Sequence, residues 1–232
     1  MAEGGQKQKQ LETFSSTISS FLLGAGQSQL TNFRRWELAR LAKDKKISIP
    51  LTANHLKMNT SNNVYLIGPM GVGKTTIGKA LAKNLALEFI DSDREIENRT
   101  GVSIMTIFDI EGDTGFRDRE VKVILEMAKR RGIVLATGGG AILRPENRQA
   151  LRNSGLVVYL HATVEMQLER TRNSHNRPLL NKGSRRSVIE DLMQEREPLY
   201  RQEADIVYVT DSRSPQAAAR EIASEIREKW QS

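Results

Sequence analysis

The stretch VYLIGPMGVGKTT, residues 64–76, joins a short apolar run to a glycine-rich loop that ends in one lysine and two threonines. It fits the pattern G-x-x-x-x-G-K-[ST] in full, between a predicted strand and a predicted helix, which is the context that supports this motif. Gly71 and Gly73 let backbone N–H groups close around phosphate oxygens, and the helix N-terminus adds partial positive charge. The stretch therefore predicts an α/β fold with a phosphate-binding loop.

Two further residues of this loop carry specific chemistry. Lys74 can span the β- and γ-phosphates of a nucleotide, and the hydroxyl of Thr75 can coordinate Mg²⁺. A glycine-rich turn that merely starts a helix is the plainer interpretation, but it does not account for the complete pattern. Motors, switches and small-molecule kinases share this loop, so the acceptor of the phosphate chemistry has to be identified from other segments.

Short apolar runs of β-forming residues recur along the rest of the chain, separated by segments with helical spacing. The runs are VYLIG (64–68), LEFID (87–91), GIVLATG (132–138), GLVVYLH (155–161) and IVYVTD (206–211). Nearly continuous hydrophobic strands joined by helices indicate a parallel sheet covered on both faces. Ligands of such sheets bind beyond the carboxyl ends of the strands.

Glycines and carboxylates follow the predicted strands at that edge. DSD, residues 91–93, closes the second run, and TGGG, residues 137–140, ends the third. Asp91 and Asp93 can hold a magnesium-bound water or accept a proton from an attacking hydroxyl, although Asp93 also fits a helix N-cap. Three consecutive glycines indicate close approach of the backbone to a ligand, with a flexible turn as the alternative.

Three charged segments are ambiguous by themselves. GFRDRE (115–120) is consistent with a helix that buries Phe116 and exposes residues 117–120 as surface ion pairs. RTRNSHNRPLLNKGSRR (170–186) is consistent with a solvent-exposed basic loop or with a mobile loop that closes over phosphates. REPLYR (196–201) follows it in the next helical segment.

The composition limits what kind of protein this is. A chain of 232 residues with 38% hydrophobic and 27% charged residues can bury one sizeable core. It has no cysteine, which excludes disulfides and thiolate metal sites, and its three histidines, His55, His161 and His175, lack metal-ligand spacing. Any metal is therefore expected to be held by oxygen ligands.

The net charge of +7 is concentrated at the N-terminus. Residues 1–57 contain nine Lys or Arg and four Asp or Glu, whereas the remainder is nearly balanced. A basic surface is therefore not expected on the main body, and no nucleic-acid partner is predicted. No apolar run approaches the ~20 residues that a membrane helix needs, so no membrane partner is predicted either.

Residues 1–60 read as an N-terminal extension of unknown role, predicted to be partly helical or disordered, before a domain that spans residues 61–232. Its helical segment is NFRRWELARLAKDKK (32–46), and Met58 offers a second start close to the domain. The hydroxyl-rich FSSTISS (14–20) gives plastid import as an alternative, but the acidic residues around it favour a cytoplasmic location.

Six motifs together resemble the shikimate kinase family. GPMGVGKTTIG, DSDREIE, FDIEGDTGFRDRE, ATGGGA, NRPLL and REPLY occur in that family's order and approximate spacing, over residues 64 to about 213. The resemblance implies a P-loop, nucleoside-monophosphate-kinase-like α/β three-layer sandwich. Its five-stranded parallel sheet has the order 2-3-1-4-5 between helices, with a substrate-binding region and a lid near residues 172–186. The implied reaction transfers the γ-phosphoryl group of ATP to the 3-hydroxyl of shikimate, in chorismate and aromatic amino acid biosynthesis.

The resemblance implies the nucleotide side of the site. One Mg²⁺ ion per subunit binds Thr75 directly and Asp91 through water, and Lys74 contacts the phosphates. Arg170 lies against the adenine, and Arg213 matches a position near the nucleotide that varies within the family. The implied ATP-binding residues are Gly71, Val72, Gly73, Lys74, Thr75, Thr76, Arg170, Arg177 and Arg213.

The resemblance also implies the acceptor side. Asp93 orients or deprotonates the hydroxyl, and the planar guanidinium groups of Arg117 and Arg196 bind the substrate carboxylate. Arg177, in NRPLL, enters with the lid and neutralises charge on the transferred group, so the implied catalytic residues are Lys74, Asp93 and Arg177. The implied substrate-binding residues are Asp93, Arg117, Gly138, Gly139, Gly140 and Arg196.

Two alternatives remain open. A related small-molecule kinase, such as a gluconate kinase, would use the same loop with another acceptor, but Arg117 and Arg196 together with Asp93 favour an anionic carbocycle. A nucleotide-sensing regulator would use the basic N-terminal segment, although no helix-turn-helix signature is found there. The predicted partners are ATP and shikimate, and the chain is predicted to be a monomer.

Overall fold

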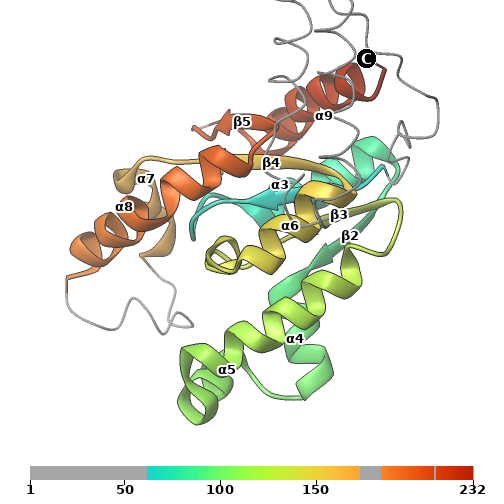
Figure 1. Ribbon diagram of the computed structural model, residues 1–232. Helices are drawn as coiled ribbons and strands as arrows, with labels where there is room; N and C mark the ends of the chain where they lie inside the picture. Colours follow the sequence, from blue (N-terminus) through green and yellow to red (C-terminus); the bar gives the residue numbers. More distant parts are fainter. Residues whose placement is uncertain (1–61, 173–183, 212, 232) are drawn as a thin grey trace, which may run out of the picture. The chain divides into compact units, whose positions relative to one another are not determined.

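The structure is a computed structural model that describes residues 62–172, 184–211 and 213–231. Its centre is a parallel sheet in the order β2-β3-β1-β4-β5 (Figure 1). The predicted five-stranded sheet, its order and its parallel direction are confirmed, and each strand lies within the run predicted for it. The strands are β1 (Val64–Ile67), β2 (Glu88–Asp91), β3 (Ile133–Ala136), β4 (Leu156–His161) and β5 (Ile206–Val209).

Helices alternate with the strands along the chain, as the pattern predicts. None of those in the described ranges has the length and apolarity that a bilayer crossing requires. In chain order the helices are α3 (Lys74–Leu85), α4 (Ser92–Thr100), α5 (Ile104–Met127), the short 3-10 helix η2 (Ala141–Leu143), α6 (Pro145–Ser154), α7 (Val164–Thr171), α8 (Arg185–Glu203) and α9 (Pro215–Gln231).

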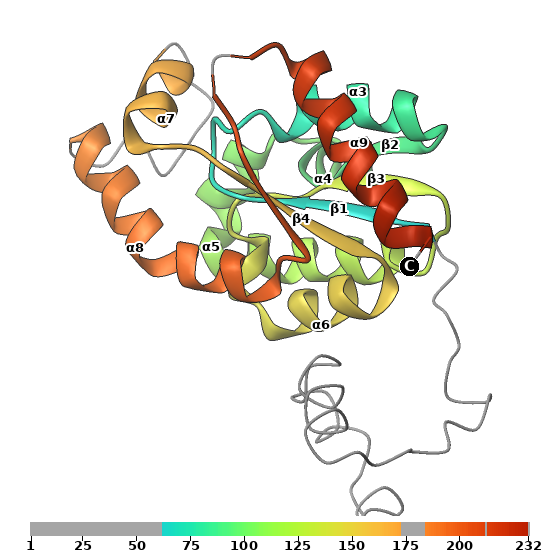
Figure 2. The ribbon, with the colours of Figure 1, turned by 90° about the horizontal axis from the view of Figure 1, so that it is seen from above.

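Two hydrophobic cores lie on opposite faces of the sheet. On β1, Val64 and Leu66 pack with residues of α3 and α9, whereas Tyr65 and Ile67 pack with residues of α5 and α6. All four side chains are at most 1% exposed, which explains why this strand is a continuous apolar run instead of an alternating one. Figure 2 shows α3 and α9 on one side of the central strands and α6 on the other.

The start of α4 is fixed at the end of β2 by Asp91. One carboxylate oxygen of Asp91 accepts hydrogen bonds from the backbone N–H groups of Asp93 and Arg94, at 3.1 and 3.3 Å. The N-cap is therefore Asp91, and the alternative that Asp93 caps this helix is wrong. Asp93 instead lies in the first turn of α4, next to the loops at the carboxyl edge of the sheet.

The long helix α5 is interrupted at Gly112, whose φ of 70° and ψ of −172° are not helical. Phe116, which follows this break, is 3% exposed, as predicted. Arg117 and Glu120 are 5% and 0% exposed, so the interpretation of residues 117–120 as a solvated face is wrong for these two. They lie three residues apart on one helix face and form an ion pair with each other.

The N-terminal extension, residues 1–60, lies outside the described residues, and so do most of the predicted lid and its Arg177. Within the lid range, Arg185 already belongs to α8. Its guanidinium group donates to the backbone carbonyls of Thr171 and Arg172, at 3.0 and 2.9 Å. The start of α8 is therefore bound to the end of α7.

Candidate active site

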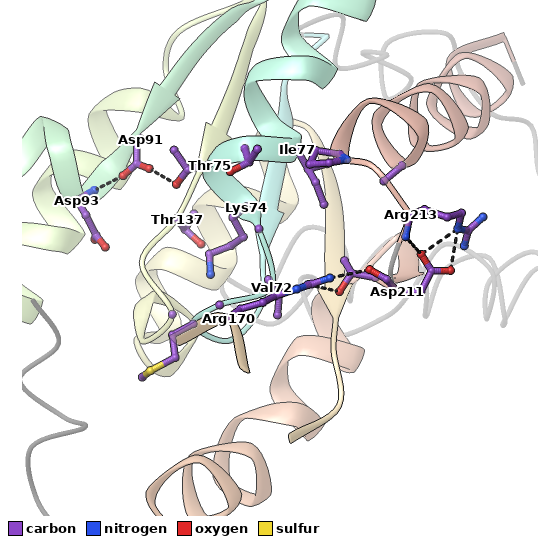
Figure 3. Close-up of a pocket in the computed structure, with 18 residues that line it drawn as sticks. Val72, Lys74, Thr75, Ile77, Asp91, Asp93, Thr137, Arg170, Asp211 and Arg213 are labelled. Carbon is purple, nitrogen blue, oxygen red and sulfur yellow. Dashed lines mark hydrogen bonds and ion pairs between the residues drawn. The ribbon is translucent and has the colours of Figure 1, made fainter. Parts of the chain in front are cut away.

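A cavity of about 560 Å³ lies at the carboxyl ends of the strands (Figure 3). The loops after β1, β2, β3 and β5 all contribute to its walls, as expected for a ligand site in an open parallel sheet. The site residues predicted from the sequence that line it are Gly71, Val72, Gly73, Lys74, Thr75, Thr76, Asp91, Asp93, Gly139, Arg170 and Arg213.

The loop after β1 requires glycine at two positions. Gly71 and Gly73 have φ angles of 78° and 93°, in the left-handed region that favours glycine. A Cβ at Gly71 would also lie 2.9 Å from the Cγ2 of Thr171. Gly73 precedes α3 without any side-chain cap from the described residues, and Lys74 to Thr76 line the cavity. The positive end of the helix dipole therefore lies at the cavity wall, where it favours an anion.

The ammonium group of Lys74 is bound within the same loop. It donates to the backbone carbonyls of Gly68 and Pro69, at 2.7 and 2.8 Å. Figure 3 shows this side chain in the cavity beside Thr137. A flexible cation can exchange neutral carbonyl partners for phosphate oxygens, with which its hydrogen bonds are stronger.

Thr75 and Asp91 place two oxygen donors side by side. The hydroxyl of Thr75 donates to one carboxylate oxygen of Asp91 at 2.7 Å, and the other carboxylate oxygen caps α4. Both residues line the cavity (Figure 3). Hydroxyl and carboxylate oxygens are ligands that Mg²⁺ accepts, and the contact with α4 fixes the orientation of the carboxylate.

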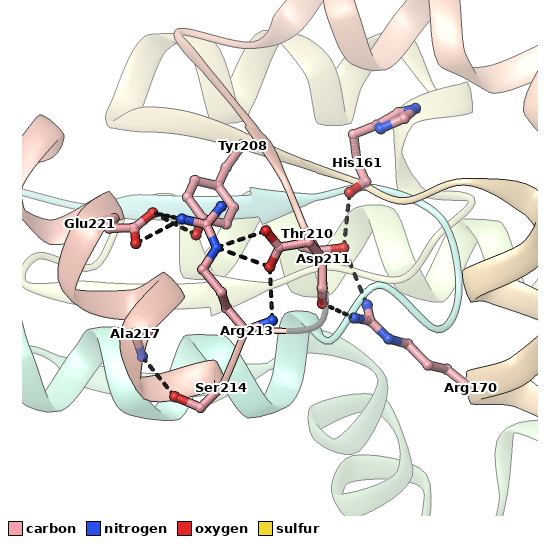
Figure 4. A network of polar contacts seen from close by, with 9 residues as sticks. All are labelled: His161, Arg170, Tyr208, Thr210, Asp211, Arg213, Ser214, Ala217 and Glu221. Carbon is pink, nitrogen blue, oxygen red and sulfur yellow. Dashed lines mark hydrogen bonds and ion pairs between the residues drawn. The ribbon is translucent and has the colours of Figure 1, made fainter.

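Arg170, at the end of α7, is held by the segment that follows β5 (Figure 4). Its guanidinium group donates to the hydroxyl of Thr210 at 3.2 Å and to the backbone carbonyl of Asp211 at 2.6 Å. Thr210 is itself anchored to β4, because its hydroxyl donates to the carbonyl of His161 at 2.9 Å. These contacts attach Arg170 to the ends of two strands.

Arg213 lies on the same side of the cavity and is already paired (Figure 4). Its Nε donates to the carboxylate of Asp211 at 2.7 Å, and another guanidinium nitrogen lies 2.8 Å from a carboxylate oxygen of Glu221. The guanidinium also lies 5.7 Å from the centre of the Tyr208 ring. The Arg213 side chain is 47% exposed, so this network lies at the surface.

Residues 138–140, the glycine wall, follow β3, and Gly139 among them lines the cavity. Gly138 and Gly140 leave no room for a side chain. A Cβ at Gly138 would lie 2.4 Å from a carboxylate oxygen of Glu120 and 2.7 Å from one of Asp93. A Cβ at Gly140 would lie 2.5 Å from the guanidinium carbon of Arg117. The bare backbone therefore leaves space for two carboxylates and one guanidinium group directly beside the glycine wall.

The ion pair of Arg117 and Glu120 is buried beside this wall. The pKa of Glu120 is raised to about 7, mainly by burial. The charge of Arg117 opposes this rise, and the charge of Asp93 adds to it. Burial by itself would lower the pKa of Arg117. The carboxylates of Glu120 and Asp113 have the larger combined effect and hold this pKa above its ordinary value. Within the described residues, the second carboxylate oxygen of Glu120 has no hydrogen-bond partner.

Arg196, on α8, is 8% exposed, and its Nε lies 3.3 Å from a carboxylate oxygen of the neighbouring Glu195. Its charge, like that of Arg117, opposes the rise in the pKa of Glu120, so both arginines act on one buried carboxylate. Neither arginine is among the described residues that line the cavity itself. The structure thus places Arg117 against the glycine wall at Gly140, and it brings both arginines of the predicted carboxylate-binding pair near Glu120.

Several contributors to the site were not predicted from the sequence. Thr137 and Asp211 line the cavity, and Glu120 pairs with Arg117. Thr137 and Asp211 follow β3 and β5 closely, so the rule that ligands bind at strand ends could have found them. Glu120 could have been found from its spacing of three residues from Arg117 on a helix.

Comparisons with known proteins agree with the geometry. The family model for shikimate kinase matches residues 70–227. The shikimate kinase of Hahella chejuensis is 51% identical over 172 residues, which cover 74% of this chain and 90% of that protein. The shikimate kinase of Pseudomonas aeruginosa (strain LESB58) is 53% identical over 165 residues, which cover 71% and 96%.

A solved structure is similar over the same part of the chain. It is the shikimate kinase from Acinetobacter baumannii in complex with shikimate, with a TM-score of 0.71 and 46% sequence identity. The match covers 72% of this chain and 94% of that one. The sheet order, the phosphate-binding loop and these relatives lead to one conclusion: this chain belongs to the shikimate kinase family.

Proposed function

We propose that this chain transfers the γ-phosphoryl group of ATP to the 3-hydroxyl of shikimate and releases shikimate 3-phosphate and ADP. One observation carries the proposal. The phosphate-binding loop and Asp93 line the same cavity, and the buried Arg117 lies against its glycine wall at Gly140. A kinase for an anionic polyol needs a phosphate site, an acceptor for a hydroxyl hydrogen bond and a cation for the carboxylate.

On the nucleotide side, residues 71–76 bind the phosphates of ATP through backbone N–H groups. Lys74 leaves its two carbonyl partners in the loop and contacts the β- and γ-phosphates, where it stabilises the charge of the transition state. Arg170, fixed by the segment after β5, lies against the adenine, and Arg213 contacts the nucleotide from the surface side.

Thr75 and Asp91 would hold one Mg²⁺ ion per subunit, Thr75 as a direct ligand and Asp91 through water. Their oxygens lie 2.7 Å apart on the cavity wall, which supports this assignment. When bound, the ion neutralises charge on the phosphate oxygens. The capping contact of Asp91 with α4 keeps its carboxylate oriented toward Thr75.

On the acceptor side, Asp93 accepts a hydrogen bond from the 3-hydroxyl and orients or deprotonates it for attack on the γ-phosphorus. Arg117 and Arg196 bind the substrate carboxylate, and the backbone of the glycine wall lies against the substrate. A guanidinium group suits a planar carboxylate because two parallel N–H bonds can form at once.

The lid completes the proposed mechanism, although it rests on the family resemblance because residues 173–183 lie outside the described ranges. Arg177 enters with the lid and neutralises charge on the transferred group, as Lys74 does from the loop. Closure of the lid keeps water away from the phosphoryl group. A cytoplasmic location and a monomeric state remain predictions.

A coupled assay of ADP release tests this function directly. The full chain is assayed with ATP and Mg²⁺, once with shikimate and once with gluconate, and the phosphorylated product is identified by mass spectrometry. We expect turnover with shikimate and a rate at least about 100-fold lower with gluconate. Gluconate lacks the rigid ring that fixes the distance between the carboxylate and the reacting hydroxyl. Turnover with gluconate alone would overturn the proposal in favour of the related kinase.

A further inference from the structure

The backbone carbonyls of the glycine wall are all hydrogen-bonded, but only one of them reaches a distant element. Those of the first and third glycine accept from the N–H groups of Ala141 and Leu143, within the same turn, at 3.2 and 3.0 Å. The carbonyl of Gly139, which lines the cavity, accepts from the hydroxyl of Tyr200, 61 residues further along the chain. Tyr200 therefore attaches the glycine wall to α8.

The donor side of this bond is rigid. Tyr200 is 1% exposed, and its ring stacks on that of Tyr159 with 5.0 Å between ring centres and an angle of 21°. Burial raises the pKa of Tyr200 well above its ordinary value, so the hydroxyl keeps its proton and can donate at neutral pH. Gly139, which it contacts, has the wide conformational freedom of a glycine, so this contact restricts its position.

Tyr200 also lies next to a residue of the acceptor side. Arg196 precedes it by four residues on α8, and residues with this spacing are neighbours on one helix face. The charge of Arg196 opposes the rise that burial causes in the pKa of Tyr200, as expected for two neighbouring groups. One helix therefore carries a guanidinium group and, one turn later, the hydroxyl that holds Gly139.

We infer that Tyr200 is a positioning residue: its hydroxyl holds the Gly139 carbonyl at a fixed place relative to Arg196, and so sets the shape of the pocket for the substrate carboxylate. The inference rests on the proposed function, since it assumes that Arg196 and the glycine wall contact the acceptor substrate. Tyr200 itself acts through Gly139 and need not touch the substrate.

The chain offers a matched pair of variants for the test. Tyr200→Phe removes the hydroxyl and keeps the stacked ring. Tyr159→Phe removes a hydroxyl from the other ring of the same stack, one that is buried and has no hydrogen-bond partner among the described residues. Steady-state kinetics of the full chain give KM for shikimate, for shikimate methyl ester and for ATP, and circular dichroism gives the melting temperature of each variant.

We expect Tyr200→Phe to raise KM for shikimate about tenfold, which corresponds to a loss of about 1.4 kcal/mol, in the range of one hydrogen bond. KM for ATP should stay within about twofold, and the preference for shikimate over its methyl ester should fall, because only the ester lacks the carboxylate charge. Tyr159→Phe should change none of these ratios. A loss of overall stability alone would lower activity with both acceptors alike and leave their ratio unchanged.

Two results would overturn the inference, and they are distinguishable. If the unmodified chain phosphorylates shikimate and Tyr200→Phe keeps its KM and its preference over the ester, the positioning role is wrong while the proposed function stands. If the unmodified chain leaves shikimate unphosphorylated, the proposed function fails and the inference fails with it. Equal effects of Tyr200→Phe and Tyr159→Phe would also contradict the role, because only Tyr200 contacts Gly139.

Discussion

The two halves of the cavity are built in different ways. The nucleotide half is built mainly on one continuous segment, residues 70–77, which lines the cavity, and its cation Lys74 donates to the backbone carbonyls of Gly68 and Pro69. The acceptor half collects charged side chains from separate helices, and Arg117, Glu120 and Arg196 are at most 8% exposed. Phosphate binding is thus obtained from local backbone geometry, whereas the acceptor site depends on buried charges that are costly unless they are paired.

This difference predicts that the largest purely catalytic effect lies in the nucleotide half. Lys74→Ala should lower kcat by about 10³-fold, because a preorganised cation at the transferred phosphoryl group is lost. The melting temperature should change little, since Lys74 is only partly buried. Lys79→Ala, on the exposed side of the same helix, is the control and should retain full activity. A kcat for Lys74→Ala within tenfold of the unmodified chain contradicts the assignment.

In the acceptor half, a single substitution should damage binding and stability together. Arg117→Ala should raise KM for shikimate about 100-fold and lower the free energy of unfolding by about 3 kcal/mol, because the buried Glu120 loses its partner. Shikimate titrations and urea unfolding measure the two effects. Combining it with Glu120→Gln should restore part of the stability but not the affinity. If the double variant recovered shikimate binding, Arg117 would have no direct role.

The same contrast explains how much could be predicted from the sequence. The strand runs and the loop at 68–76 were predicted correctly, because a continuous motif and unbroken apolar strands follow from local geometry. The strand order was also correct, but it came from the family resemblance. Asp91 as the N-cap was missed, since Asp91 and Asp93 are equally good caps by residue type and only the strand end decides between them.

The acceptor half was harder to predict, for a physical reason. Arg117 and Glu120 are charged residues in a charged segment, and such a pattern usually indicates a solvated face. Their burial depends on tertiary contacts with residues that follow β3, more than fifteen positions away in sequence, where Gly138 and Gly140 leave space for them. No local pattern contains that information, so only the family resemblance indicated the role of Arg117.

The buried carboxyl of Glu120 predicts a pH dependence of stability. Folding raises its pKa from about 4.5 to about 7, so the native state holds this proton more tightly than the unfolded state does. The free energy of unfolding should therefore fall as the pH rises from about 4.5 to 7, by about 3 kcal/mol in total from this group. Urea unfolding at several pH values, compared between the unmodified chain and Glu120→Gln, isolates the contribution. An identical slope in the variant would show that the contribution comes from other groups.

The smallest effect is expected at the surface of the nucleotide half. Arg213 is 47% exposed and already paired with Asp211 and Glu221, and exposed ion pairs contribute only about 0–1 kcal/mol. Arg213→Ala should therefore raise KM for ATP about threefold or less, while Arg170→Ala, which loses an arginine fixed to the ends of two strands, should raise it more. A rise of tenfold or more for Arg213→Ala would mean that the nucleotide draws this side chain away from its two carboxylates. The nucleotide half would then also depend on a charged side chain that changes partners. The difference between a nucleotide half built from backbone and an acceptor half built from charged side chains would be smaller than the contacts in the structure indicate.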